Sequence, residues 1–187
     1  MKRKLIKILI LASVSLTASY EASAQRWSIG TDVATWLNFG TINGEVSVAV
    51  AKELTINASA QYNPWTFRIQ GDQMQNRQQT YNFGLRWWPW HIYSGWWFGA
   101  GAQYQEYNRG GILSPVTEEG NAFGMSISGG YTLMINKAFN MEFGLGVWTG
   151  ESRYTTYACP RCGKITDRGR KFFVLPNDIR IAFVFIF

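Results

Sequence analysis

The chain ends on the stretch Ile179-Arg180-Ile181-Ala182-Phe183-Val184-Phe185-Ile186-Phe187. A large apolar side chain recurs at every second position, which predicts a β-strand with one wholly apolar face. At the edge of a water-soluble sheet, such an aromatic strand would invite aggregation. Closure of the sheet into a barrel removes the edge, and lipid can cover the apolar face. The stretch therefore predicts the closing strand of a small outer-membrane β-barrel.

The first residues predict a secretory leader. Four basic residues within the first seven positions precede an apolar run from Ile8 to Leu16, and Ala22-Ser23-Ala24 follows. This order is typical of a cleavable signal peptide, and its apolar run is too short to span a membrane as a helix. We expect residues 1–24 to be the signal peptide and residues 25–187 to form one barrel domain.

Composition narrows the class of the exported chain. The leader holds four Lys or Arg and one Glu, so its removal lowers the formal net charge from +6 to about +3 and weakens any expectation of nucleic-acid binding. Aromatic residues make up 16% of the sequence, including nine Trp. After the leader there is no run of about 18 apolar residues, which excludes membrane-spanning helices. A soluble β-sandwich and a transmembrane β-barrel remain.

Alternation of apolar and polar residues predicts eight antiparallel strands, an even number as in bacterial barrels. Short connections at residues 51–53, 88–95 and 136–138 contrast with longer polar segments at 69–79, 108–120 and 153–178, which we expect to be external loops. The expected strands cover residues 26–37, 42–50, 56–62, 81–87, 96–105, 123–133, 139–147 and 179–187.

Aromatic residues gather near both ends of these strands, as in the interfacial belts of a membrane barrel, and this favours the barrel over the sandwich. At the periplasmic ends we expect Trp27, Trp87, Trp88, Trp90, Tyr93, Trp96, Trp97 and Phe139, and at the external ends Trp36, Phe39, Trp65, Phe67, Tyr104, Tyr107 and Phe123.

The polar side of the strands carries charges that define the inward face. An Arg near the midplane of the lipid face costs about 2–4 kcal/mol, so this side must point into the barrel. Charges buried there must pair. We expect a structural network that fills the lumen; a proton or solute path is the alternative. Its members are Asp32, Glu45, Arg86, Glu142 and Arg180.

The two cysteines, Cys159 and Cys162, lie in the last predicted external loop. In an exported protein the expected outcome is a local disulfide. Free or redox-active thiols and a metal site shared between chains are alternatives, but one chain offers no second cysteine pair, and the sole histidine, His91, falls on the opposite rim. No cofactor is expected.

The same loop is basic and is a candidate site for lipid phosphates or an acidic partner; a solvated loop is the alternative. Its cations are Arg161, Lys164, Arg168, Arg170 and Lys171.

Catalytic signals are few. A lipid hydrolase of the outer membrane needs a serine, a histidine base and an acid within reach, and His91 is predicted far from any external serine. We therefore expect a non-enzymatic barrel with a structural, surface-contact or assembly role through its external loops. A lipid-modifying enzyme or a narrow small-solute pore is the alternative.

Several motifs in order resemble a known family: Tyr62-Asn63-Pro64-Trp65, the segment from Tyr107 to Ile112, the Cys159–Gly163 segment and the aromatic terminus. The chain resembles small outer-membrane barrels of unknown function from anaerobic, Bacteroides-type Gram-negative bacteria, a domain-of-unknown-function class sometimes encoded near surface-fibre genes. The resemblance implies an outer-membrane location and a surface-fibre or envelope protein as a partner. It also implies an assembly signal, read by the barrel-assembly machinery, in Phe183, Phe185 and Phe187.

Overall fold

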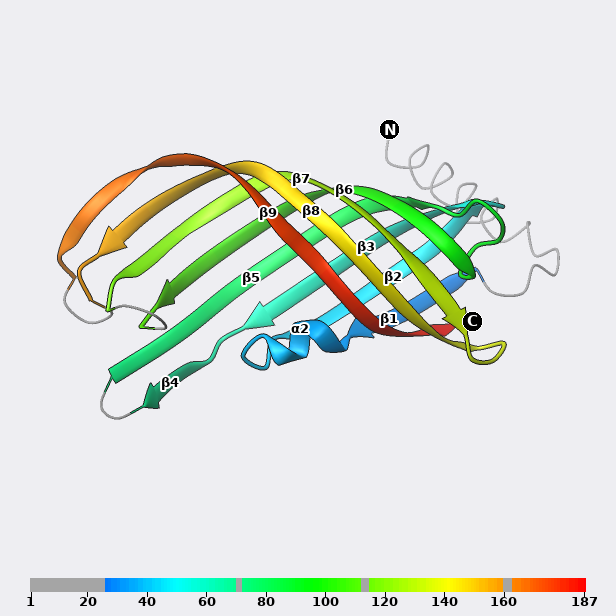
Figure 1. Ribbon diagram of the computed structural model, residues 1–187, viewed down its shortest axis with the longest axis horizontal. Helices are drawn as coiled ribbons and strands as arrows, with labels where there is room; N and C mark the ends of the chain where they lie inside the picture. Colours follow the sequence, from blue (N-terminus) through cyan, green and yellow to red (C-terminus); the bar gives the residue numbers. More distant parts are fainter. Residues whose placement is uncertain (1–25, 70–71, 112–114, 160–162) are drawn as a thin grey trace, which may run out of the picture.

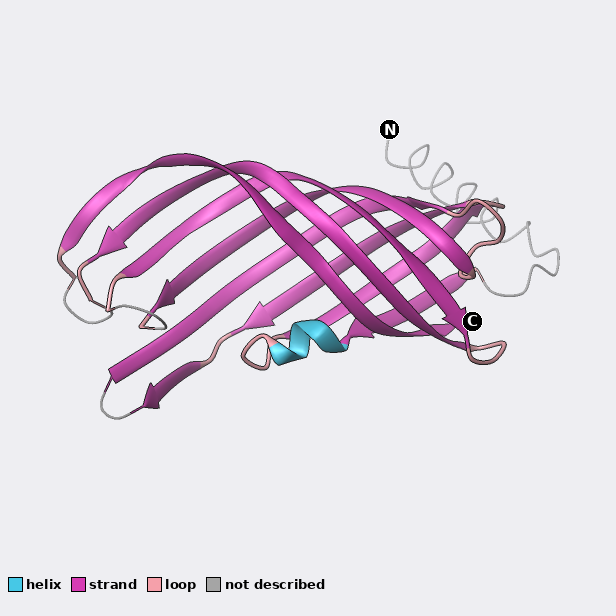
Figure 2. Ribbon diagram, in the orientation of Figure 1, coloured by secondary structure: helices cyan, strands magenta, loops and turns pink. Residues whose placement is uncertain are grey.

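The computed structural model describes residues 26–69, 72–111, 115–159 and 163–187, so the predicted leader lies outside the described residues. The described part is almost entirely antiparallel sheet, with one short helix (Figures 1 and 2). Its elements are β1 (Trp27–Asp32), α2 (Val33–Leu37), β2 (Ile42–Ala51), β3 (Leu54–Asn63), β4 (Thr66–Ile69), β5 (Asp72–Trp87), β6 (Gly95–Gly110), β7 (Thr117–Met134), β8 (Phe139–Tyr157) and β9 (Ile165–Ile186).

Eight of the strands form a closed ring. The order is β1-β2-β3-β5-β6-β7-β8-β9, every neighbouring pair is antiparallel, and β9 pairs back onto β1. Strand β4 stands outside the ring and pairs only with the first residues of β5, beyond the end of β3. The all-β class and eight ring strands agree with the prediction.

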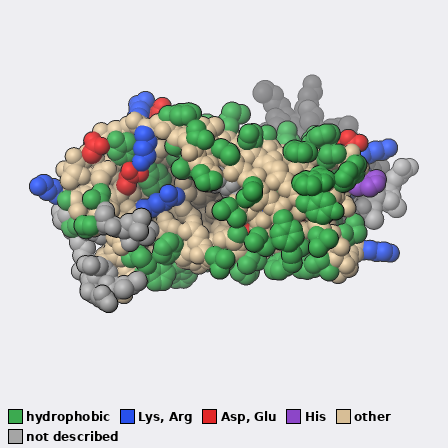
Figure 3. Space-filling view, viewed as in Figure 1, with side chains coloured by type: hydrophobic (Ala, Val, Ile, Leu, Met, Phe, Trp, Pro, Cys, Tyr) green, Lys and Arg blue, Asp and Glu red, His purple; other side chains and the backbone are tan. Residues whose placement is uncertain are grey.

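Side chains alternate between the two faces of the ring. Along β6, Trp96, Phe98 and Ala102 are exposed, whereas their neighbours Trp97 and Gln103 are buried. The exposed face is apolar along most strands, and polar groups are buried inside, which is the reverse of a water-soluble sheet protein. Hydrophobic side chains cover much of the visible surface over the ring, and most of the visible charged side chains lie toward the two ends of the molecule (Figure 3).

The strands of the ring differ greatly in length. Strand β1 has 6 residues and β9 has 22, and β5 to β9 extend well beyond the ends of β1, β2 and β3 (Figure 1). We call this extension the protruding sheet; it comprises the described residues of segments 66–79, 104–123 and 148–175. The predicted external loops are therefore wrong over most of their length, because these polar segments continue the hydrogen-bonded strands.

The first predicted strand is also wrong beyond Asp32, where α2 begins. The Asp32 carboxylate caps this helix by accepting hydrogen bonds from the Ala34 amide at 3.0 Å and the Thr35 hydroxyl at 2.7 Å. The chain then reverses through Phe39 and Gly40, which have φ values of 54° and 71°. A local capping motif thus overrides the apolar alternation of Val33 and Leu37.

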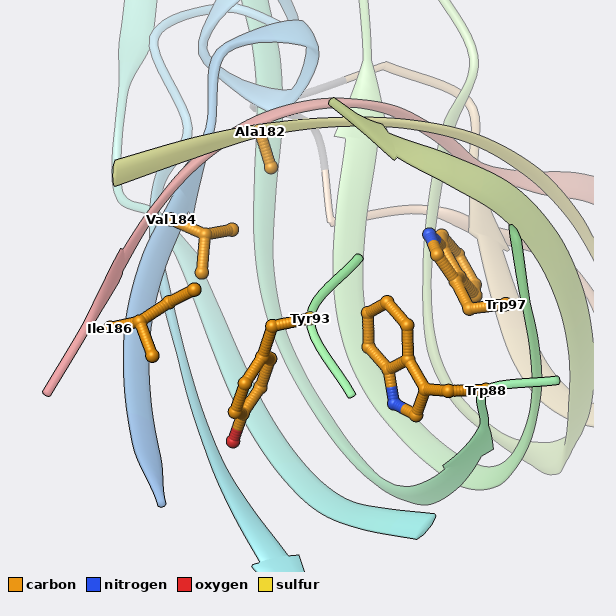
Figure 4. Packing of buried hydrophobic residues seen from close by; sticks show 6 residues of the cluster. All are labelled: Trp88, Tyr93, Trp97, Ala182, Val184 and Ile186. Carbon is orange, nitrogen blue, oxygen red and sulfur yellow. The ribbon is translucent and has the colours of Figure 1, made fainter. Parts of the chain in front are cut away.

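An aromatic cluster closes the interior at the end of the ring where the chain termini of the sheet lie. It consists of Trp88, Tyr93 and Trp97, which are 0–3% exposed and pack with the inward side chains of β9 (Figure 4). The Trp88 indole donates to the Thr55 hydroxyl at 3.1 Å, and the Tyr93 hydroxyl donates to the Arg26 carbonyl at 3.2 Å.

Two inward glycines make room for this cluster. A Cβ atom at Gly130 would lie 2.6 Å from Trp97 Cζ2, and one at Gly144 would lie 2.8 Å from the same atom. Any larger residue at either position would collide with the indole. The absence of a side chain at Gly130 and Gly144 is therefore explained by the volume of one tryptophan.

Among the outward residues assigned to the belts, Trp27, Trp87 and Trp96 lie near strand ends, whereas Tyr104 and Phe123 lie in the middle of the long strands β6 and β7. Four further residues assigned to the belts do not face outward. Trp88, Tyr93 and Trp97 point into the ring, and Tyr107 is buried on the inner side of the protruding sheet. Trp97 alternates with the exposed Trp96, so strand parity alone places it inside.

Candidate functional site

Four charged side chains meet in the middle of the ring: Glu45 of β2, Arg86 of β5, Glu142 of β8 and Arg180 of β9. Strand β5 is not a neighbour of β2, β8 or β9, so side chains from these strands can only meet inside the ring. We call this group the charge cluster. Four of the five residues predicted for the interior network are thus brought together.

Each arginine of the charge cluster bridges both glutamates. Arg86 contacts Glu45 at 2.7 Å through Nη2 and Glu142 at 3.4 Å through Nη1. Arg180 contacts Glu45 Oε1 at 2.8 Å through Nη2 and Glu142 Oε2 at 2.8 Å through Nε. The cluster contains two positive and two negative groups, so removal of any one leaves a buried charge without compensation.

Asp32, the fifth predicted member, lies apart from these pairs. Besides capping α2, its carboxylate accepts a hydrogen bond from the Ile181 amide at 3.0 Å. Ile181 is the residue just before the segment of β9 that pairs with β1. The carboxylate therefore continues the hydrogen bonding of β1 by one residue, and its role is local and structural.

The charge cluster rests directly on the aromatic cluster. The Arg86 guanidinium lies 4.7 Å from the centroid of the Trp97 ring, close enough for a cation–π contact. The interior thus has an apolar layer at one end and an ionic layer above it. The two layers stabilise the ring in different ways. The aromatic layer fills the interior by packing, and the ion pairs of the other layer join β2, β5, β8 and β9.

A polar cavity of about 570 Å³ adjoins the charge cluster and extends toward the protruding sheet. Many of its lining residues carry amide or hydroxyl groups, so it can hold water or a small polar molecule through hydrogen bonds. The Asn57 amide oxygen is buried without a hydrogen-bond partner among the described residues. The lining includes Asn43, Asn57, Ser59, Gln61, Gln78, Thr80, Asn82, Gln103, Gln105, Ser126 and Ser128.

A second polar group lies on the inner side of the protruding sheet. Glu118 accepts hydrogen bonds from Tyr107 at 2.9 Å and from Lys171 at 2.7 Å, and the hydroxyls of Tyr107 and Ser152 are 2.8 Å apart. Burial raises the pKa of Tyr107 to about 12. These contacts tie β6, β7, β8 and β9 together near their far ends.

The predicted basic loop does not exist as one surface, because most of it belongs to β9. Lys171 points to the inner side, toward Glu118, whereas Arg170 points outward and lies 3.7 Å from Glu151. Arg168 and Lys164 are exposed, and Arg161 lies outside the described residues. The outward arginines line a shallow hollow of about 830 Å³ on the protruding sheet; its charged lining is Arg77, Arg153, Arg168, Arg170, Glu106 and Glu119.

The three phenylalanines predicted as an assembly signal lie on the outward side of β9. The rings of Phe183 and Phe139 stack with centroids 5.6 Å apart, and Phe185 and Phe187 are 6.2 Å apart. The backbone of Phe187 is hydrogen-bonded to that of Trp27 in both directions. The predicted disulfide cannot be placed on the structure, since Cys162 lies outside the described residues, and it stays a prediction.

The described residues contain no group of three or more His, Cys, Asp and Glu side chains placed to hold a metal ion. His91 lies exposed in the turn before β6. No helix within the described ranges is long and apolar enough to cross a membrane. Within these residues, we take the charge cluster and the adjoining polar cavity as the candidate functional site, because buried charged groups line a cavity there.

Comparison with known sequences and structures gives one match. A protein-family model described as "Protein of unknown function (DUF3575)" matches residues 7–187. No curated protein and no solved structure matches the chain.

Proposed function

The chain belongs to the DUF3575 family, which has no assigned function, and we propose that it is a non-enzymatic outer-membrane β-barrel with a surface-contact role. In this proposal the ring spans the membrane and the protruding sheet stands outside it. The observation that carries the proposal is the reversed polarity of the ring, with apolar side chains outside and ions inside.

The outward face of β5 supports a membrane boundary. Trp87, Leu85, Phe83 and Tyr81 follow one another on this face, and each is 46–61% exposed. The next outward residues, beginning with Gln79, are polar. Lipid covers the apolar part at no cost, whereas in water it would be an aggregation surface. Short turns at the opposite end favour the usual orientation, with the protruding sheet on the external side.

The interior supports a barrel that does not conduct. The aromatic cluster closes one end, and the charge cluster holds the layer above it through four ion pairs at 2.7–3.4 Å. An eight-stranded barrel has room for side chains or one small ligand, whereas an open aqueous channel needs many more strands. We therefore assign the ion pairs a structural role rather than a transport role.

The lipid partner follows from this placement, and the two protein partners follow from the family resemblance described above. Outer-membrane lipid contacts the apolar face, and the barrel-assembly machinery reads the terminal Phe183, Phe185 and Phe187. The external sheet contacts a surface-fibre or envelope protein.

Two arginine substitutions on β5 test the membrane location. Leu85→Arg places a charge within the apolar band and should lower the free energy of unfolding in lipid vesicles by about 2–4 kcal/mol. Gln79→Arg, six residues away on the same outward face, should change it by less than about 0.5 kcal/mol. Urea titration followed by Trp fluorescence measures both. Equal effects, or a protein that stays in the aqueous phase without detergent, would contradict the proposal.

Two further measurements test the remaining parts. Purified protein in planar bilayers should give no stable openings, and large steady conductance would favour a pore. Incubation with phospholipid or lipid A should release no acyl chains; release that is abolished by one substitution would favour the lipid-modifying alternative.

A further inference from the structure

Strand β9 has a partner on both sides over only part of its length. It pairs with β8 from Ile165 onward, but its pairing with β1 covers only residues 182–186. Among the described elements, α2 is the other one that packs against β9, and it lies beside the C-terminal half (Figure 1). The segment from 166 to 175 therefore has one side of its backbone unpaired. Such a side is a template for a further strand.

The direction of the backbone groups in this segment can be derived from one hydrogen bond. The Thr149 hydroxyl of β8 donates to the Phe173 carbonyl at 3.0 Å, so the polar backbone groups of Phe173 face β8. Because these groups alternate along an antiparallel strand, those of Phe172 and Val174 face the unpaired side. Pro176 has the same parity, and a proline is tolerated in a strand only where its missing N–H faces an edge.

The side chains of these same residues give the edge a chemical character. Phe172 is 75% exposed and Val174 is 62% exposed, and both lie on the outward face. Arg168 and Arg170 precede them on that face and are exposed as well. The edge therefore presents two cations followed by two large apolar groups, at alternate positions.

We propose that an extended segment of another protein adds to β9 as an antiparallel strand along residues 166–175. Backbone hydrogen bonds to Arg170, Phe172 and Val174 provide the affinity of such strand addition, and the side chains provide its specificity. The segment that fits carries apolar, strand-forming residues beside Phe172 and Val174 and acidic residues beside Arg170 and Arg168. This names the surface and the partner chemistry for the contact role proposed above.

A second copy of the chain does not fit this edge. If the proposed membrane location holds, two copies share one orientation, and their tilted β9 strands would cross at about twice the strand tilt, roughly 70–90°. Strands at that angle cannot form a ladder. Anionic lipid could neutralise Arg168 and Arg170, but it would leave the backbone groups unpaired. An acidic extended peptide satisfies both.

A synthetic peptide tests the proposal with the full protein in detergent. The peptide Thr-Val-Thr-Val-Thr-Glu-Thr-Glu-Thr sets its valines beside Val174 and Phe172 and its glutamates beside Arg170 and Arg168 in the antiparallel direction. Fluorescence anisotropy should show that it binds at least tenfold more tightly than the peptide with Lys in place of Glu, because the Lys peptide meets like charges. In the Arg168→Gln/Arg170→Gln variant this preference should be lost.

N-methylated peptides separate strand addition from simple charge attraction, with the protein itself unchanged. Methyl groups on the Val and Glu amides block hydrogen bonds toward β9 and should abolish binding, whereas methyl groups on alternate Thr amides should be tolerated. Amide hydrogen exchange of Phe172 and Val174 should slow at least tenfold in the complex. Equal binding of all peptides, no protection of these amides, or arginine-dependent binding to anionic vesicles alone would overturn the proposal. None of these readouts depends on membrane insertion, so their failure is distinct from failure of the barrel proposal.

Discussion

The ring and the protruding sheet share strands β5 to β9, but they differ in how far their strand edges and charges are shielded from solvent. In the ring every strand has two neighbours, and the charges lie inside, where Glu142 is 1% exposed. Strands β1, β2 and β3 do not extend into the protruding sheet, so β9 pairs there with β8 alone. The Glu118–Lys171 ion pair in this region is partly exposed. Breaking an ion pair should therefore lower the free energy of unfolding more in the ring than in the protruding sheet, because a buried charge without a partner costs more than an exposed one.

The largest expected contrast comes from one carboxylate in each region. Glu142→Gln leaves Arg86 and Arg180 with a single buried partner charge and should lower the free energy of unfolding by about 3–5 kcal/mol. Glu118→Gln removes a partly exposed pair and should cost about 0–1 kcal/mol. Urea unfolding in detergent or vesicles gives both values. Similar losses for the two variants would mean that the regions do not differ in the way burial implies.

A smaller contrast compares the inside and the outside of the ring at neighbouring glycines. Gly130→Ala would put a Cβ atom 2.1 Å from the Phe143 carbonyl oxygen and 2.6 Å from Trp97, and such overpacking costs about 1–3 kcal/mol. Gly129→Ala meets its nearest atom at 3.4 Å, an ordinary contact, and should be neutral or stabilise by about 0.4–1 kcal/mol. Thermal unfolding of the two variants measures the difference. A tolerated Gly130→Ala would show that Trp97 has room to move.

The smallest effect concerns the inner side of the protruding sheet at high pH. The pKa of Tyr107 is raised to about 12 by burial, so the stability contributed by the neutral hydroxyl is complete below about pH 10 and is lost as the pH rises toward 12. The tyrosinate absorbance of the wild type minus that of Tyr107→Phe should therefore titrate near pH 12. A difference curve centred near pH 10 would indicate an exposed phenol and a loosely packed sheet end.

Much of the ring could be predicted from the sequence because one face of each strand is apolar there. The period of two is clear in residues such as Ile181, Phe183 and Phe185, and the cost of a charge in lipid assigns Arg86 and Arg180 to the inside. The protruding sheet could not be predicted in the same way. Both faces of residues 75–79 and 166–171 lack apolar side chains, so the alternation that marks a strand disappears although the backbone remains paired.

Prediction of the candidate site was uneven for similar reasons. The pairing of Glu45 with the two arginines follows from parity and charge alone. Asp32 has the same charge but also precedes a helix, and the Asp32–Thr35 spacing is a capping signal that competes with a role in the network. The inward position of Trp97 was available from its alternation with Trp96. The open edge of β9 arises because β9 extends far beyond the end of β1, and the polar residues 166–171 carry no alternation that predicts this extension.

The position of β9 in the chain has a consequence for how the molecule is made. Glu45 and Arg180 are 135 residues apart, and β1 finds its second neighbour only in the last strand. Loop closure over such separations is slow, and no earlier hairpin can substitute for it. Until β9 has been synthesised, Glu45 and Trp97 lack the strand that completes their enclosure, so closure of the ring must wait for β9.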